Sequence, residues 1–81
     1  MRSNASLERI IALSERAWAM KCGKKIAEVL KRRDVLFNGN DIDRMLAPKM
    51  AQQMLRLYGV KKELQPESIE VAKRYQPQVH V

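Results

Sequence analysis

Residues 6–33 read SLERIIALSERAWAMKCGKKIAEVLKRR, and this stretch decides the fold. On a helix of 3.6 residues per turn, six of its apolar side chains fall within about 100° of one another. These six are Leu7, Ile11, Trp18, Cys22, Ile26 and Val29. Asn4 or Ser6 can accept hydrogen bonds from the first turn, and Glu8 suits the positive end of the helix dipole. The stretch therefore predicts one long amphipathic helix with its apolar stripe toward the core.

Gly23 is the position at which this helix could break. A glycine inside a helix costs about 1 kcal/mol relative to alanine. The run Lys21-Cys22-Gly23 also has the form of a helix end, with Gly23 in a left-handed conformation. Because the apolar stripe keeps its phase across Gly23, we favour one continuous helix, although two helices joined at Gly23 remain an open alternative.

The middle of the chain predicts a second helix over about 41–58. Asn38-Gly39 indicates a turn within the connection 34–40, and Asn40 suits the N-cap position. Pro48 is expected to interrupt the helix near 47–48, because a proline disfavours helical geometry at the residue before it. Gly59 is expected to end this helix. The inward face of this helix is predicted to hold Leu46, Met50, Met54 and Leu57.

A third helix is predicted over 66–75, and the residues after it are expected to form an extended tail, 76–81. Pro66 suits the first position of this helix, with Glu67 near its positive end and two cations near its negative end. We expect it to pack through Ile69, Ala72 and Tyr75. No run of residues alternates at period two, so strands are not expected.

Length and composition limit the architecture. A chain of 81 residues allows one domain, and its 46% hydrophobic content is typical of a globular protein. We see no internal repeat and no linker. The predicted fold is all-α, a small bundle of three to four helices in a single domain over 1–81. Helical chains of this size bury a modest core and often gain stability from a second copy or a partner.

The residues that catalysis or metal binding would need are scarce. Cys22 and His80 form the single Cys/His pair, and a base near the chain terminus is poorly held for nucleophilic catalysis. A closed zinc site needs three or four such ligands. An EF-hand loop over 34–45 fails because Leu36 and Met45 occupy positions that require oxygen ligands. We therefore expect a binding protein that is not an enzyme, with no cofactor and no metal.

Targeting signals give a further expectation. The first residues lack the apolar core of a signal peptide, and no apolar run approaches the ~20 residues of a membrane span. The lone cysteine excludes an internal disulfide. These features favour a cytoplasmic location.

Positive charge is concentrated in one segment. The formal net charge is +7, and residues 21–33 supply +5 of it through six basic residues and Glu28. On a helix, five of the six lie on one flank, beside the apolar stripe. Successive basic side chains on this flank are placed to contact the phosphates of a polyanion along the helix. The predicted nucleic-acid contacts are Lys21, Lys24, Lys25, Lys31, Arg32 and Arg33. A solvated helix end, an acidic protein surface and a membrane surface are the alternatives.

The mode of nucleic-acid binding is expected to be contact with the backbone rather than with bases. Both candidate turns are about seven residues long, whereas a DNA-reading helix-turn-helix has a turn of three or four. The four aromatic residues are scattered, so a stacking platform for single strands is not expected either. The choice between DNA and RNA stays open.

The N-terminal half of the first helix is apolar around much of its circumference. Such a helix is usually enclosed on more than one side, which predicts a homodimer interface formed by Leu7, Ile10, Leu13, Ala17 and Met20. The expected role is a nucleic-acid-associated accessory or regulatory factor. The alternative is a helical adaptor or inhibitor that docks on a larger protein. A membrane-surface role ranks last because Trp18 lies in the predicted core stripe.

Overall fold

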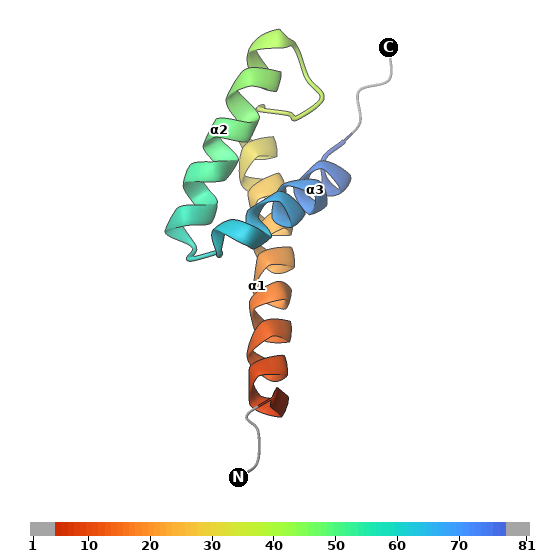
Figure 1. Cartoon of the computed structure of the whole chain (residues 1–81). Helices are drawn as coiled ribbons and strands as arrows, with labels where there is room; N and C mark the ends of the chain where they lie inside the picture. The colour runs from red at the N-terminus through yellow and green to blue at the C-terminus, as the bar shows by residue number, and fades with distance from the viewer. Residues whose placement is uncertain (1–4, 78–81) are drawn as a thin grey trace.

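The computed structural model describes residues 5–77, which form three α-helices and one short 3₁₀ turn. Helix α1 spans Ala5–Arg32, α2 spans Asp41–Leu57 and α3 spans Gln65–Tyr75, with the 3₁₀ turn at Lys62–Leu64. In Figure 1, α3 crosses α1 near its middle, and α2 lies beside the C-terminal half of α1. The N-terminal half of α1 projects beyond both. The predicted all-helical class with a long first helix is confirmed, and the described residues contain no strand.

Helix α1 runs without a break through Gly23, because this glycine serves a contact rather than a helix end. Gly23 is buried beneath α3, and a Cβ atom at this position would lie 2.5 Å from the carbonyl oxygen of Ser68. The hydroxyl of Ser68 donates a hydrogen bond of 2.7 Å to the carbonyl of Ala19, one turn earlier on α1. Small side chains on this side of α1 thus let the backbones of the two helices come close.

Helix α2 is continuous through Pro48, so the predicted interruption at 47–48 is wrong. The helix begins as expected, with the side chain of Asn40 accepting a 2.8 Å hydrogen bond from the backbone N–H of Asp43. Pro48 is exposed, while Ala47 beside it is fully buried. Burial of this side of α2 holds the helix together despite the hydrogen bond that proline cannot make. After the helix ends, Gly59 adopts a left-handed conformation with a φ of 74°.

The core lies where the three helices meet, and it is built from different residues than the apolar stripes predicted. In α1 the buried positions follow the helical period: Ala19, Cys22, Gly23, Ile26, Ala27 and Leu30. The predicted stripe is correct for Cys22 and Ile26 and wrong for its N-terminal members, Leu7, Ile11 and Trp18, which are 43–57% exposed. These three lie where α2 and α3 do not reach.

The predicted inward faces of α2 and α3 need a similar correction. In α2 the buried residues are Ala47, Ala51 and Leu55, whereas Met50 and Met54 are partly buried and Leu46 and Leu57 are exposed. In α3 the buried residues are Ser68, Val71 and Ala72, and Tyr75 is exposed. Alanines lie where the helices contact one another, because a small side chain permits the shortest distance between two helices.

The predicted tail begins with a residue that is part of the core. Gln76 is 5% exposed. Its side-chain oxygen accepts a 2.7 Å hydrogen bond from the N–H of Phe37, and its amide nitrogen donates to the carbonyls of Val35 at 3.0 Å and Ala27 at 3.4 Å. One side chain thereby fixes the end of α3 to α1 and to the connection after it. Residues 78–81 of the predicted tail lie outside the described residues.

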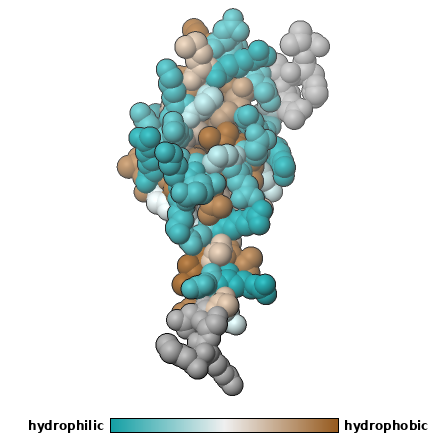
Figure 2. Space-filling view, in the orientation of Figure 1, coloured by the Kyte–Doolittle hydropathy of each residue, from teal (hydrophilic) through white to brown (hydrophobic). Residues whose placement is uncertain are grey.

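The projecting half of α1 makes the molecule elongated. Its extents are 59 × 22 × 17 Å and its radius of gyration is 15.0 Å, against roughly 12 Å for a compact domain of this length. In Figure 2, hydrophobic side chains gather on this projecting part, below the more hydrophilic body. We call residues 5–20 of α1 the arm.

Candidate functional surfaces on the first helix

Five of the six predicted phosphate-binding residues lie together on α1, and we call them the basic face: Lys21, Lys24, Lys25, Lys31 and Arg32. All five are exposed. At about 100° per residue, their mean direction is about 180° from that of the buried residues of α1. The sequence placed this flank beside the core stripe, and the structure places it opposite the core. The reason is that α3 packs on Gly23 and its small neighbours. The buried side of α1 is therefore a different side from the one that the apolar stripe predicted.

Two lysines of the basic face contact tyrosine rings from different parts of the body. The Nζ of Lys24 lies 5.0 Å from the ring centroid of Tyr75, at the end of α3. The Nζ of Lys25 lies 5.2 Å from the ring centroid of Tyr58, just after α2. Cation–π contacts of this length are attractive and leave the charge in place. Sequence reasoning missed both tyrosines, because these contacts join residues far apart in the chain.

The basic face has one acid within it. Glu28 lies near the centre of the face and forms a 2.9 Å ion pair with Arg32, one turn along α1. Both side chains are mostly exposed, so this pair is weak in water. Among the described residues, no ion pair joins Lys21, Lys24, Lys25 or Lys31 to α2 or α3. The face therefore keeps most of its positive charge directed toward solvent.

Arg33 is separated from the other predicted contacts. It lies in the turn after α1 rather than on the helix. There it borders a largely apolar groove of about 300 Å³ between α1 and α2, lined also by Val29, Met50, Gln53, Met54, Leu57 and Tyr58. Its charge is thus directed toward the α2 side of the molecule, and the structure does not group it with the basic face.

The arm exposes large apolar side chains along its length. Leu7, Ile10, Leu13 and Met20 are between 46% and 60% exposed, and Ala17 is exposed as well. All five predicted interface residues are therefore accessible on the described structure. A second exposed apolar group, which sequence reasoning missed, lies on α2 with Ile42 72% and Met45 66% exposed.

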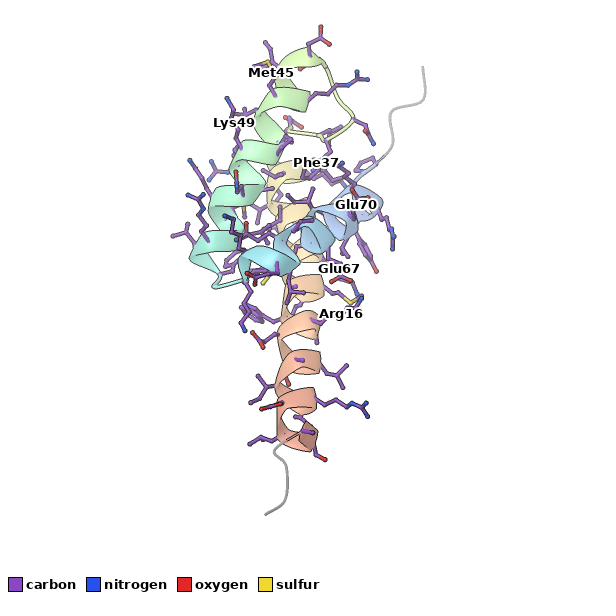
Figure 3. The ribbon with its side chains drawn as sticks, in the orientation of Figure 1. Arg16, Phe37, Met45, Lys49, Glu67 and Glu70 are labelled. Atoms are coloured by element: carbon purple, nitrogen blue, oxygen red, sulfur yellow. The ribbon has the colours of Figure 1, made fainter. Side chains whose placement is uncertain are left out.

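The polar side of the arm is fastened to the body at its base. Figure 3 shows Arg16 of α1 beside Glu67 of α3, joined by a 2.7 Å ion pair. On the same part of α1, Glu15 pairs with Lys61 at 2.7 Å. These partners raise the pKa of Arg16 and of Lys61 above their ordinary values, mainly through the side-chain hydrogen bonds. Glu15 and Arg16 thus face the body, and Ile10, Leu13 and Ala17 lie on the other side of the helix.

Trp18 forms a further link between the arm and the body. Its indole Nε1 donates a 2.7 Å hydrogen bond to the carbonyl of Tyr58, at the C-terminal end of α2. Trp18 therefore satisfies a backbone carbonyl that the last turn of α2 leaves free. This role explains why a large aromatic residue remains 43% exposed at the edge of the core.

Cys22 is buried, and burial is the main cause that raises the pKa of its thiol. No group of three His, Cys, Asp or Glu side chains within 5–77 is arranged to hold a metal ion. Within the same range, no helix is long and apolar enough to cross a membrane.

The surfaces of α1 thus divide along the helix axis, with an apolar arm followed by a basic face on the side away from the body. Comparison of the chain with protein-family models, with curated proteins and with solved structures found no match.

Proposed function

We propose that this protein acts by binding rather than by catalysis, and that its basic face contacts the phosphates of nucleic acid. The observation that carries the proposal is the common direction of the five cations, opposite the core and free of ion pairs to α2 and α3 among the described residues. Phosphates attract such a face through long-range Coulomb forces and through the release of counterions.

The length of the face suits a polyanion. Lys21 and Arg32 are 11 residues apart, which corresponds to about 16 Å along the helix axis. Several successive phosphates can lie along that distance, since duplex DNA carries one charge per about 1.7 Å of its axis. Lysine and arginine side chains reach phosphates without reading bases, so we expect binding with little sequence preference.

The alternative explanation, a solvated helix end, accounts for only some of the cations of the basic face. Lys31 and Arg32 lie in the last turn of α1, where cations complement the negative end of the dipole. Lys21, Lys24 and Lys25 lie more than a turn earlier, and the dipole effect is confined to the last turn. Of these three, Lys24 and Lys25 contact tyrosine rings, and such contacts leave their charges available to a polyanion.

The test is a titration of the full chain against generic duplex and single-stranded nucleic acid at two salt concentrations. Lys24→Glu/Lys25→Glu should abolish most of the binding. Lys49→Glu/Lys62→Glu makes the same change in net charge between α2 and α3 and should retain more of it. The logarithm of the affinity should fall with the logarithm of salt by about 0.7–0.9 per phosphate contact. Equal losses in both variants, or no binding at low salt, would contradict the proposal.

A second candidate function is a helical protein-interaction module that works through the arm. The observation that favours it is the group of large apolar residues exposed between Leu7 and Met20, since exposed apolar patches mark interaction sites. Binding through the arm would respond little to salt, which separates it from phosphate binding.

A further inference from the structure

We propose that two copies of this chain pair through their arms as antiparallel helices. Four exposed apolar residues of the arm, Ile10, Leu13, Ala17 and Met20, are spaced three, four and three residues apart. This is the spacing of the apolar seam of a coiled coil. We call these four residues the seam.

The seam is open to a second helix. Its mean direction on α1 is more than about 120° from that of the buried residues. Glu15, which pairs with Lys61, lies opposite the seam, and Arg16, which pairs with Glu67, lies about 80° from its centre. A second helix can therefore lie along the seam from Ile10 to Met20, and Tyr75 at the end of α3 borders it at Lys24.

The seam is complementary to itself when the second arm runs in the opposite direction. In that arrangement Ile10 of one copy faces Met20 of the other, and Leu13 faces Ala17. The symmetry of the pair repeats both contacts, which gives four layers. The layers of Leu13 and Ala17 match a large side chain with a small one, as close packing of two helices requires.

Charge selects the antiparallel direction. The seam continues in phase into Lys24, which ends it, and the basic face follows. A parallel pair would place two basic faces side by side, and the juxtaposition of like charges at an interface is unfavourable. An antiparallel pair instead puts the centres of the two faces roughly 35 Å apart along the axis.

The exposed surface is sufficient for a weak dimer. Of the seam residues, Ile10, Leu13 and Met20 expose between 46% and 60% of their surface, on the order of 300 Å² per copy. Two such seams amount to about 600 Å² of apolar surface, below the roughly 1,000 Å² of a stable specific interface. We therefore expect a weak dimer that dissociates at micromolar concentration rather than a permanent one.

The experiment is sedimentation of the full chain without nucleic acid, from about 1 to 200 µM, the range expected for an interface of this size. The mass should rise to twice that of the monomer. Leu13→Glu places a charge in the seam and should weaken dimerisation at least about tenfold. Ile42→Glu changes an exposed apolar residue on α2, 72% exposed against 60% for Leu13, and should leave dimerisation unaltered. Helix content by circular dichroism should match wild type in both variants.

Orientation is tested by cross-linking in a Cys22→Ala background. Ser6→Cys chains mixed with Lys24→Cys chains should form a mixed disulfide, because these positions face each other only in an antiparallel pair. Disulfides formed mainly between two Ser6→Cys chains would show a parallel pair and overturn the orientation. A monomer across the whole concentration range would overturn the dimer, and would leave the phosphate-binding proposal untouched.

Discussion

Gly23 lies directly beneath the backbone of Ser68, so close that a Cβ atom on the glycine would sit 2.5 Å from the Ser68 carbonyl oxygen and 2.9 Å from the Cβ of Val71. The same serine donates a hydrogen bond to Ala19. The crossing of α1 and α3 thus depends on the absence of a side chain at one position and on a buried hydroxyl close to it.

Gly23→Ala should destabilise the protein despite the higher helix propensity of alanine. The gain in propensity is about 1 kcal/mol, but the added methyl group meets backbone that cannot rotate away, and overpacking typically costs 1–3 kcal/mol. We expect a net loss of up to about 2 kcal/mol in the free energy of urea unfolding. Ser14→Ala, an exposed change on the arm, is the control and should be neutral or slightly stabilising. A stabilised Gly23→Ala protein would show that α3 does not lie this close to α1.

Gln76→Ala should also destabilise the fold. The sequence predicted residue 76 to lie in an extended tail, where the loss of a side chain would have little effect. The change leaves the N–H of Phe37 and the carbonyl of Val35 without this partner in a buried location. Each buried polar group without a partner costs about 1–3 kcal/mol, so for the two groups we expect a loss of at least about 2 kcal/mol in denaturant unfolding. The exposed Gln52→Ala on α2 serves as the control and should change stability by less than about 0.5 kcal/mol. Equal effects of the two changes would contradict the role of Gln76 in fixing the end of α3 to α1 and to the connection after it.

Pro48→Ala should stabilise the protein. Inside α2, alanine restores a backbone hydrogen bond and removes the clash of the proline ring with the preceding turn. Part of this gain is offset because the unfolded chain becomes more flexible without proline, so we expect a net gain of about 1–2 kcal/mol in thermal or urea unfolding. Pro66→Ala is the matched control, since Pro66 lies in the first turn of α3, where no hydrogen bond is lost. If Pro66→Ala stabilised the protein as much, the benefit would not come from the helix interior.

The thiol of Cys22 should react slowly and only at high pH. Burial raises its pKa above the ordinary value of 9.0, and the nearby Lys25 and Lys21 offset this in part. The folded state therefore holds the proton where the unfolded state loses it, so stability should fall as pH rises above about 9. Alkylation by iodoacetamide, followed by mass spectrometry, should be slower in the folded chain than in urea at the same pH. Rapid alkylation of the folded chain at neutral pH would contradict a buried, protonated thiol.

The helices themselves were predictable because their signals are local. Capping by Asn40, the spacing of apolar residues and the placement of Pro66 act within one or two turns, and they give the three helices close to their observed bounds. The concentration of lysine and arginine within 21–33 is likewise visible directly in the sequence. The excess of apolar residues in the arm indicated that three short helices barely enclose it, but the predicted stripe placed Leu7, Ile11 and Trp18 in the core, and they are exposed.

The sequence by itself determined the helical class, the long first helix and the local excess of positive charge, since these depend on neighbours three and four residues apart. Tertiary structure decided which side of α1 faces the core, because the direction of burial is set by where α3 and α2 pack, through Gly23 and the buried alanines. It also decided that Gln76 closes the fold and that Tyr58 and Tyr75 contact two lysines. Those contacts join residues about 30 to 50 positions apart, and no local pattern in the chain encodes them.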